Sequence, residues 1–118
     1  MTNKSTAGDF DLAELEALTH GDKSLLNELI ELFIEQTSIQ LNNLDNAVQN
    51  GNYELIRTIT HSLKSSYLLI GFGKKELILN LEQIAKNPKQ QSKKEIQKIL
   101  LQLKKETVKV IKQMEKSL

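Results

Sequence analysis

The chain has 118 residues, enough for one domain with a modest hydrophobic core and too few for a multidomain catalyst. Its formal net charge is +1 and it has no cysteine, which excludes disulfide scaffolds, thiolate metal sites and thiol catalysis. No apolar run approaches the roughly 20 residues of a membrane span, and residues 1–5 lack the apolar stretch of a signal peptide. We therefore expect a cytoplasmic protein without a membrane partner.

The hydrophobic pattern is helical along the whole chain. Residues 1–8 are polar, and we expect them to form a disordered leader to a single domain over residues 9–118. A short helix is predicted at residues 11–18, with Asp9 or Asp11 available to cap its N-terminus. Longer amphipathic helices are predicted at residues 23–49, 53–70, 74–86 and 92–118. Short loops between them predict an all-α fold, namely an antiparallel up-and-down four-helix bundle with an additional short N-terminal helix.

One helical face carries the residues that could take part in a chemical reaction. In the helix predicted at residues 53–70, Ile56, Ile59 and Leu63 fall on one side at 100° per residue, and His61 lies almost opposite them. A neutral imidazole in water is a usable nucleophile. Side chains one turn further on can reach any group attached to it, and these are Lys64 and Ser65. Spacing alone leaves open the alternative of a surface histidine without a function.

The last predicted helix is strongly basic. From residue 93 to the end, the chain has eight lysines and three glutamates. The lysines alternate with apolar residues at helical spacing, and this segment contains no arginine and no aromatic residue. We therefore interpret it as a solvated lysine face, with no nucleic-acid partner. Ser92 is expected to cap this helix.

Residues 60–71, Thr-His-Ser-Leu-Lys-Ser-Ser-Tyr-Leu-Leu-Ile-Gly, resemble the phosphoacceptor motif of histidine-containing phosphotransfer (HPt) domains of two-component phosphorelays. In that family a small residue precedes the histidine, an apolar residue and a lysine follow it, small residues come next, and a glycine ends the helix. Two positions depart from the pattern: Tyr67 stands where small residues are common, and Leu69 stands where a small polar residue often occurs. We expect Tyr67 to pack on the core side. The resemblance covers residues 11–87, and the last helix matches only in type.

The resemblance implies a phosphoryl carrier. His61 would accept a phosphoryl group from the aspartate of one receiver domain and pass it to the aspartate of another. Lys64 would offset the phosphoryl charge, and the small Ser65 would leave room for the receiver. Gln83 occupies a position at which many members place a side chain that orients the histidine. Partner-docking residues are expected around the histidine, at Arg57, Leu68 and Leu79.

The same resemblance implies no cofactor and no metal site in this chain, because Mg²⁺ would come with the receiver. The chain has neither a glycine-rich phosphate loop nor length for a kinase domain, so we expect a carrier and not an enzyme. Its expected partners are response-regulator receiver domains or a hybrid sensor kinase, and we expect a monomer. The alternative is a non-catalytic helical interaction module, either a degenerate HPt-like domain or a nucleic-acid-binding bundle. A degenerate member would have lost His61 or Lys64, and this chain keeps both.

Overall fold

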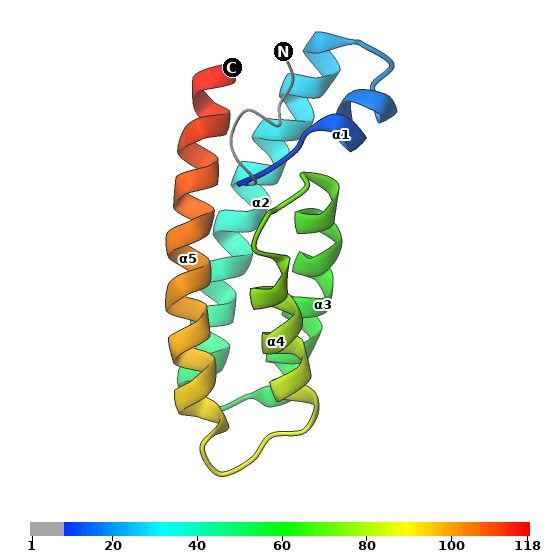
Figure 1. The fold of residues 1–118 in the computed structure, drawn as a ribbon. Coiled ribbons are helices and arrows are strands. Elements are labelled where there is room, and N and C mark those ends of the chain that lie inside the picture. Colours follow the sequence, from blue (N-terminus) through cyan, green and yellow to red (C-terminus); the bar gives the residue numbers. More distant parts are fainter. Residues whose placement is uncertain (1–8) are drawn as a thin grey trace.

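The computed structural model describes residues 9–118, which form five helices and no strand (Figure 1). The predicted leader at residues 1–8 lies outside the described residues. The helices are α1 (Ala13–Leu18), α2 (Lys23–Gln49), α3 (Tyr53–Leu69), α4 (Lys75–Lys86) and α5 (Ser92–Ser117). The all-α fold, with a four-helix bundle and a short N-terminal helix, is confirmed, and each helix boundary lies within two residues of its predicted place.

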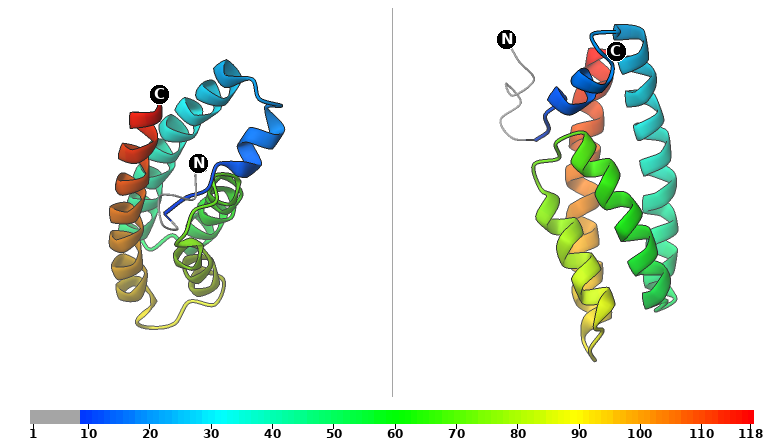
Figure 2. Two further views of the ribbon diagram at one scale, coloured as in Figure 1. Left: turned by 45° about the horizontal axis from the view of Figure 1, so that its top comes forward. Right: turned by 90° about the vertical axis from the view of Figure 1, so that its right-hand side faces the viewer.

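The four long helices run alternately down and up, and each packs on the next one in the chain. α5 also packs against α2, which closes the bundle. Helices α3 and α5 consequently occupy diagonal corners, as the tilted view in Figure 2 (left) shows. Their outer faces therefore point to opposite sides of the molecule.

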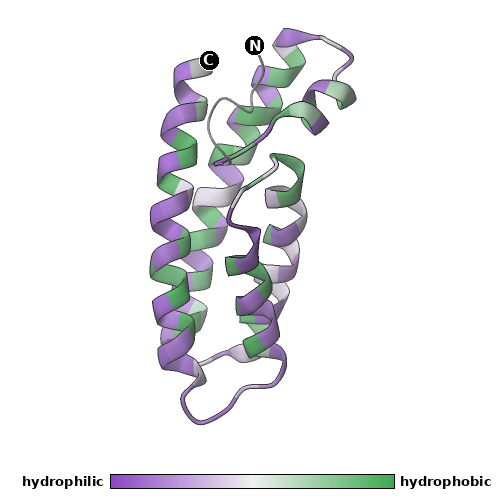
Figure 3. Ribbon diagram, in the orientation of Figure 1, coloured by the Kyte–Doolittle hydropathy of each residue, from purple (hydrophilic) through white to green (hydrophobic). Residues whose placement is uncertain are grey.

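A continuous hydrophobic core runs along the bundle axis. Each long helix contributes one leucine whose side chain is completely buried, namely Leu44, Leu63, Leu81 and Leu103. Hydrophilic segments recur along every long helix between the hydrophobic ones (Figure 3), which is the pattern of helices with one buried face. Among the described residues, no helix combines the length and the apolar character needed to cross a membrane.

Tyr67 is buried in this core, as predicted. Its ring packs against Phe33 and edge-on against Phe72, with centroid distances of 5.8 and 4.6 Å. Its hydroxyl lies 2.7 Å from the hydroxyl of Thr107 on α5, so the polar end of the ring has a partner. Burial raises the pKa of Tyr67 well above its usual range. The departure from the family pattern at this position therefore lies away from the exposed face of α3.

Side-chain caps fix several helix starts. Asp22 accepts a hydrogen bond from the backbone N–H of Leu25 at the start of α2. Neither Asp9 nor Asp11 is the N-cap of α1, which is Leu12 and makes no side-chain cap hydrogen bond. Asp11 lies one residue earlier and accepts a hydrogen bond from the N–H of Ala13, the first helical residue. The cap predicted for Ser92 is wrong. Ser92 is the first helical residue of α5, and its hydroxyl accepts from the N–H of Lys89 in the preceding loop.

A segment before α1 straps the turn between α3 and α4. The N–H of Asp11 donates to the carbonyl of Ile70, and the N–H of Gly73 donates to the carbonyl of Asp9. Gly71 lies between these two bonds with φ +62°, and a Cβ there would lie 2.5 Å from the carbonyl oxygen of Asp11. Only glycine fits this approach.

Gly71→Ala is therefore expected to destabilise the fold by about 2–4 kcal/mol, from left-handed backbone strain together with the steric clash. Gly51→Ala is the matched control, because Gly51 has φ +65° and a Cβ at this position would meet no atom within 4 Å. Gly51→Ala should lower the free energy of unfolding only through the left-handed backbone strain, by about 1–2 kcal/mol. Urea unfolding of both variants measures the difference, and equal losses would show that the strap does not constrain residue 71.

Candidate functional site

The buried stripe of α3 turns His61 towards solvent. Ile56, Thr60 and Leu63 face the core, and the hydroxyl of Thr60 donates back to the carbonyl of Ile56, so it needs no outside partner. His61 lies on the opposite side of the helix, and its side chain is 71% exposed. A partner molecule can therefore reach the imidazole without any rearrangement of the bundle.

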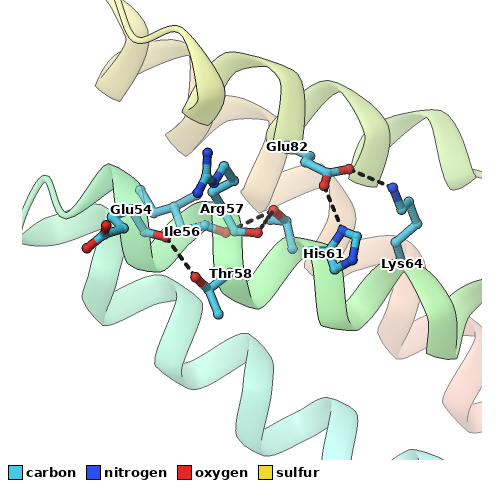
Figure 4. Close-up of polar contacts among 8 residues, drawn as sticks. Glu54, Ile56, Arg57, Thr58, His61, Lys64 and Glu82 are labelled. Carbon is cyan, nitrogen blue, oxygen red and sulfur yellow. Dashed lines mark hydrogen bonds and ion pairs between the residues drawn. The ribbon is translucent and has the colours of Figure 1, made fainter.

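His61 is held by a glutamate from the neighbouring helix. Nδ1 of His61 lies 3.0 Å from Oε2 of Glu82 on α4, and Nζ of Lys64 lies 2.9 Å from Oε1 of the same carboxylate (Figure 4). The Glu82 side chain is only 9% exposed, whereas that of Lys64 is 30% exposed. A carboxylate with so little exposure to water needs partners for both of its oxygens, and the two contacts from α3 provide them.

The charge on Glu82 fixes the tautomer of His61. The hydrogen bond from Lys64, followed by that from His61, lowers the pKa of the Glu82 carboxyl below its usual value. Glu82 is therefore ionised at neutral pH and can only accept hydrogen bonds. Nδ1 must carry the proton in this contact, which leaves the lone pair of a neutral ring on Nε2. Within residues 9–118 Nε2 makes no hydrogen bond, and it points away from Glu82 (Figure 4).

This carboxylate makes stability depend on pH. Because the folded-state pKa of Glu82 is lowered, its stabilising contribution is present above the usual carboxyl pKa and is lost as the pH falls through the folded-state value. His61→Gln should therefore lose more stability between roughly pH 5 and pH 3 than the double variant that also carries Glu82→Gln. Urea unfolding at several pH values measures this. Both variants lack the imidazole of His61, so its own titration does not enter the comparison. A difference in unfolding free energy between the two variants that does not change with pH would contradict the prediction.

The residue predicted to orient the histidine is one position off. Gln83 is exposed, and the contact predicted for it is made by Glu82. Helical spacing in the sequence places Leu77, Leu81 and Ile84 on one apolar stripe, with Gln83 well away from it, but in the structure Ile78 is buried and Ile84 is only partly buried. This turns the buried face by roughly 50°, which brings Glu82 to the edge facing α3 and moves Gln83 to the outside. An acidic residue beside a buried apolar stripe, on the helix next to His61 and Lys64, was the signal available in the sequence.

The other predicted site residues lie on the surface of the bundle. The exposed side chains are Arg57, Ser65, Leu68 and Leu79. Arg57 lies one turn before His61 and helps to line an open hollow with Thr58, His61, Lys64, Glu82 and Lys86. Three cations and one carboxylate give this hollow a net positive charge, which suits an anionic partner group. The docking roles of Arg57, Leu68 and Leu79 stay predictions.

A second hollow lies on the other side of α3. It is mostly apolar and is lined by residues of α1, α2 and the end of α3, namely Leu15, Leu29, Leu32, Phe33, Gln36, Ser66, Leu69 and Ile70. Leu32 and Leu69 are also exposed to solvent. This apolar surface was not predicted from the sequence, because it forms only where three helices meet in space.

Among residues 9–118, no group of three or more histidine, cysteine, aspartate or glutamate side chains lies close enough to hold a metal ion. Comparisons with protein-family models, curated proteins and solved structures gave no match. The function must therefore be argued from the geometry of His61, Lys64 and Glu82.

Proposed function

We propose that the protein is a phosphoryl carrier of the HPt type, in which His61 accepts a phosphoryl group from the aspartyl phosphate of one receiver domain and transfers it to the aspartate of another. The observation that carries this proposal is the hydrogen bond from Nδ1 of His61 to Glu82. It leaves the lone pair on Nε2, the nitrogen that a partner can approach. The resemblance of residues 60–71 to the HPt phosphoacceptor motif supplies the reaction class.

The transfer step can be written with these atoms. The lone pair of Nε2 attacks phosphorus, an N–P bond forms, and the P–O bond to the receiver aspartate breaks, so that its carboxylate leaves with the bonding electrons. Nδ1 keeps its proton, so the imidazole ring becomes positively charged, and the adjacent carboxylate of Glu82 stabilises that charge. Attack by the carboxylate of a second receiver breaks the N–P bond and returns the ring to its neutral form.

Lys64 affects both the carboxylate that orients His61 and the phosphoryl group that His61 receives. Its ion pair with Glu82 makes that carboxylate a weak base, so Glu82 orients the proton on Nδ1 without removing it. The ammonium has three donors, and only one is used by Glu82. The remaining donors can compensate the charge of a phosphoryl group one helical turn away. Lys64 therefore tunes the rate and the lifetime of phosphohistidine without bonding to phosphorus.

The partner in this proposal is an acidic receiver active site that brings its own Mg²⁺. The cationic hollow around Arg57, Lys64 and Lys86 complements that acidic site. Leu68 and Leu79 are 51% and 44% exposed, and they supply apolar contact on the same side of the bundle. We infer that the receiver docks over this combined surface.

A phosphotransfer assay tests the proposal. Receiver domains are charged with acetyl phosphate and Mg²⁺ and then mixed with the protein, and intact mass spectrometry follows the gain of one phosphoryl group. We expect an acid-labile, alkali-stable modification that maps to His61. A purely structural interaction module would bind receivers and stay unmodified. Absence of transfer from every member of a broad receiver panel, or modification at another residue, would overturn the proposal.

A further inference from the structure

The outer face of α5 carries a straight row of cations. Five lysines lie within about 40° of one another around the helix, at 100° per residue. They are Lys94, Lys98, Lys105, Lys112 and Lys116, and all five are exposed. The other three lysines of α5 have partners, since Lys93 donates to the carbonyl of Gln49, Lys104 pairs with Asp45, and Lys109 pairs with Asp9 and Glu106. Among the residues that the structure describes, none of the five has an ion-pair partner.

Two aliphatic side chains complete this row. Leu101 is 71% exposed and Val108 is 50% exposed, and both fill gaps between the lysines along the same side of α5. They do not belong to the core side of α5, which is formed by Ile96, Leu100, Leu103, Val110 and Met114. We call the seven residues of the row, the five lysines with Leu101 and Val108, the lysine stripe.

In the isolated protein the lysine stripe carries uncompensated positive charge and exposed aliphatic side chains, and both are energetically unfavourable. Lys94 and Lys98, like Lys112 and Lys116, are spaced i,i+4, where like charges repel. Leu101 and Val108 bury little surface on folding, so they add little to the core. An external anionic surface would compensate the charges and cover the two aliphatic side chains.

We propose that the lysine stripe binds the surface of an anionic phospholipid bilayer. This replaces the expectation of no membrane partner, which rested on the absence of a membrane-spanning segment and does not bear on binding to a membrane surface. A helix that touches a plane makes contact along a line, and residues 94 to 116 span about 33 Å of such a line. Because the lysines share one side of the helix, all five can reach the same plane of headgroups. Leu101 and Val108 would enter the interfacial region while the lysine stems extend to the phosphates.

A nucleic acid fits the lysine stripe less well. The phosphate backbone of a duplex winds away from a straight row of side chains, so few of the five lysines could contact phosphates together. The stripe also contains no arginine for bidentate phosphate contacts and no aromatic residue for stacking on bases. The test must therefore distinguish binding to nucleic acid from binding to anionic vesicles.

Binding through α5 would leave His61 accessible. α5 and α3 occupy diagonal corners of the bundle (Figure 2). The lysine stripe lies on the outer side of α5 and the exposed imidazole on α3, so a bilayer against the stripe would not cover His61. The proposal is independent of phosphoryl transfer, since no residue of the stripe belongs to the site around His61.

Co-sedimentation with vesicles tests the lysine stripe. We expect the protein to bind vesicles of mixed phosphatidylglycerol and phosphatidylcholine at low salt, to be released as salt rises, and to ignore vesicles of phosphatidylcholine alone. Lys105→Gln with Lys112→Gln should weaken the partition coefficient roughly five-fold per lysine removed. Leu101→Ser with Val108→Ser should weaken it without any change of charge. Lys74→Gln with Lys75→Gln removes the same charge outside the stripe and should bind like the wild type.

Three results would overturn the proposal: no binding of the wild type to anionic vesicles at low salt, equal binding by the stripe variants and the Lys74/Lys75 control, or tighter binding to duplex DNA than to vesicles at the same salt. Circular dichroism of each variant confirms that the fold is retained. Phosphoryl acceptance is measured on the same samples. If vesicles bind and no receiver transfers a phosphoryl group to any sample, the membrane site stands and the carrier function fails.

Discussion

Replacing His61 by glutamine is expected to abolish phosphoryl acceptance while leaving helical content and the thermal unfolding midpoint close to those of the wild type. The nucleophilic Nε2 is lost, and no other group of the site can form the N–P bond. The side chain is 71% exposed, so its removal leaves no cavity in the core, and the amide of the new glutamine can donate to Oε2 of Glu82 in place of Nδ1. Substitutions at such positions usually change stability by only about 0.5 kcal/mol. The phosphotransfer assay and a circular dichroism melt measure the two quantities.

His20 provides the matched control, because it is the only other histidine of the chain. It is an exposed residue between α1 and α2 with φ +51°. Lys23 and Ser24 follow it at the same spacing as Lys64 and Ser65 follow His61, but His20 lies outside the helices, and among the described residues no carboxylate forms an ion pair with it. His20→Gln should accept phosphoryl groups like the wild type. A His61→Gln protein that still becomes phosphorylated would disprove the assignment of the nucleophile.

The fold follows from signals that are local in the sequence. Apolar periodicity and helix-ending residues placed both ends of α2 correctly, because Asp22 caps its start and Gly51 takes a positive φ after its end. The same periodicity turned His61 and Lys64 outward together, since both belong to one helix. Features that depend on one helix alone, such as its ends and its exposed face, can be predicted from the apolar pattern of that helix.

Contacts between helices were harder to predict. α4 has only 12 residues, and apolar side chains occur on much of its circumference, including the exposed Leu79 and the partly buried Ile84. Its pattern therefore allows several rotations about the helix axis, and simultaneous packing against α3 and α5 selects one of them. That rotation decides whether Glu82 or Gln83 meets His61. The strap of Asp9 and Asp11 over the turn after α3 was also not predicted, because backbone hydrogen bonds between distant segments leave little trace in the sequence.

The selected rotation leads to a second large effect. Glu82→Ala is expected to slow phosphoryl transfer to His61 about 10- to 100-fold, by analogy with the loss of groups that orient metal-bound histidines. Without the carboxylate, the neutral ring is free to carry its proton on Nε2, and the positive charge that develops during attack loses its partner. Glu82→Gln should also slow transfer. Its amide can donate to Nδ1 and so stabilise the tautomer whose Nε2 is protonated.

The kinetic form of this loss separates orientation of the ring from docking of the partner. Because the Glu82 side chain is only 9% exposed, a receiver barely touches it, and the transfer rate at saturating receiver should fall while the receiver concentration for half-maximal rate stays the same. The ¹⁵N shifts of the imidazole should report the Nδ1-protonated tautomer in the wild type and a mixture in Glu82→Ala. Gln83→Ala, next along α4 and exposed, should behave like the wild type in both measurements. Slower transfer in Gln83→Ala with unchanged transfer in Glu82→Ala would show that the ring is oriented by the residue first predicted from the sequence and not by the buried carboxylate.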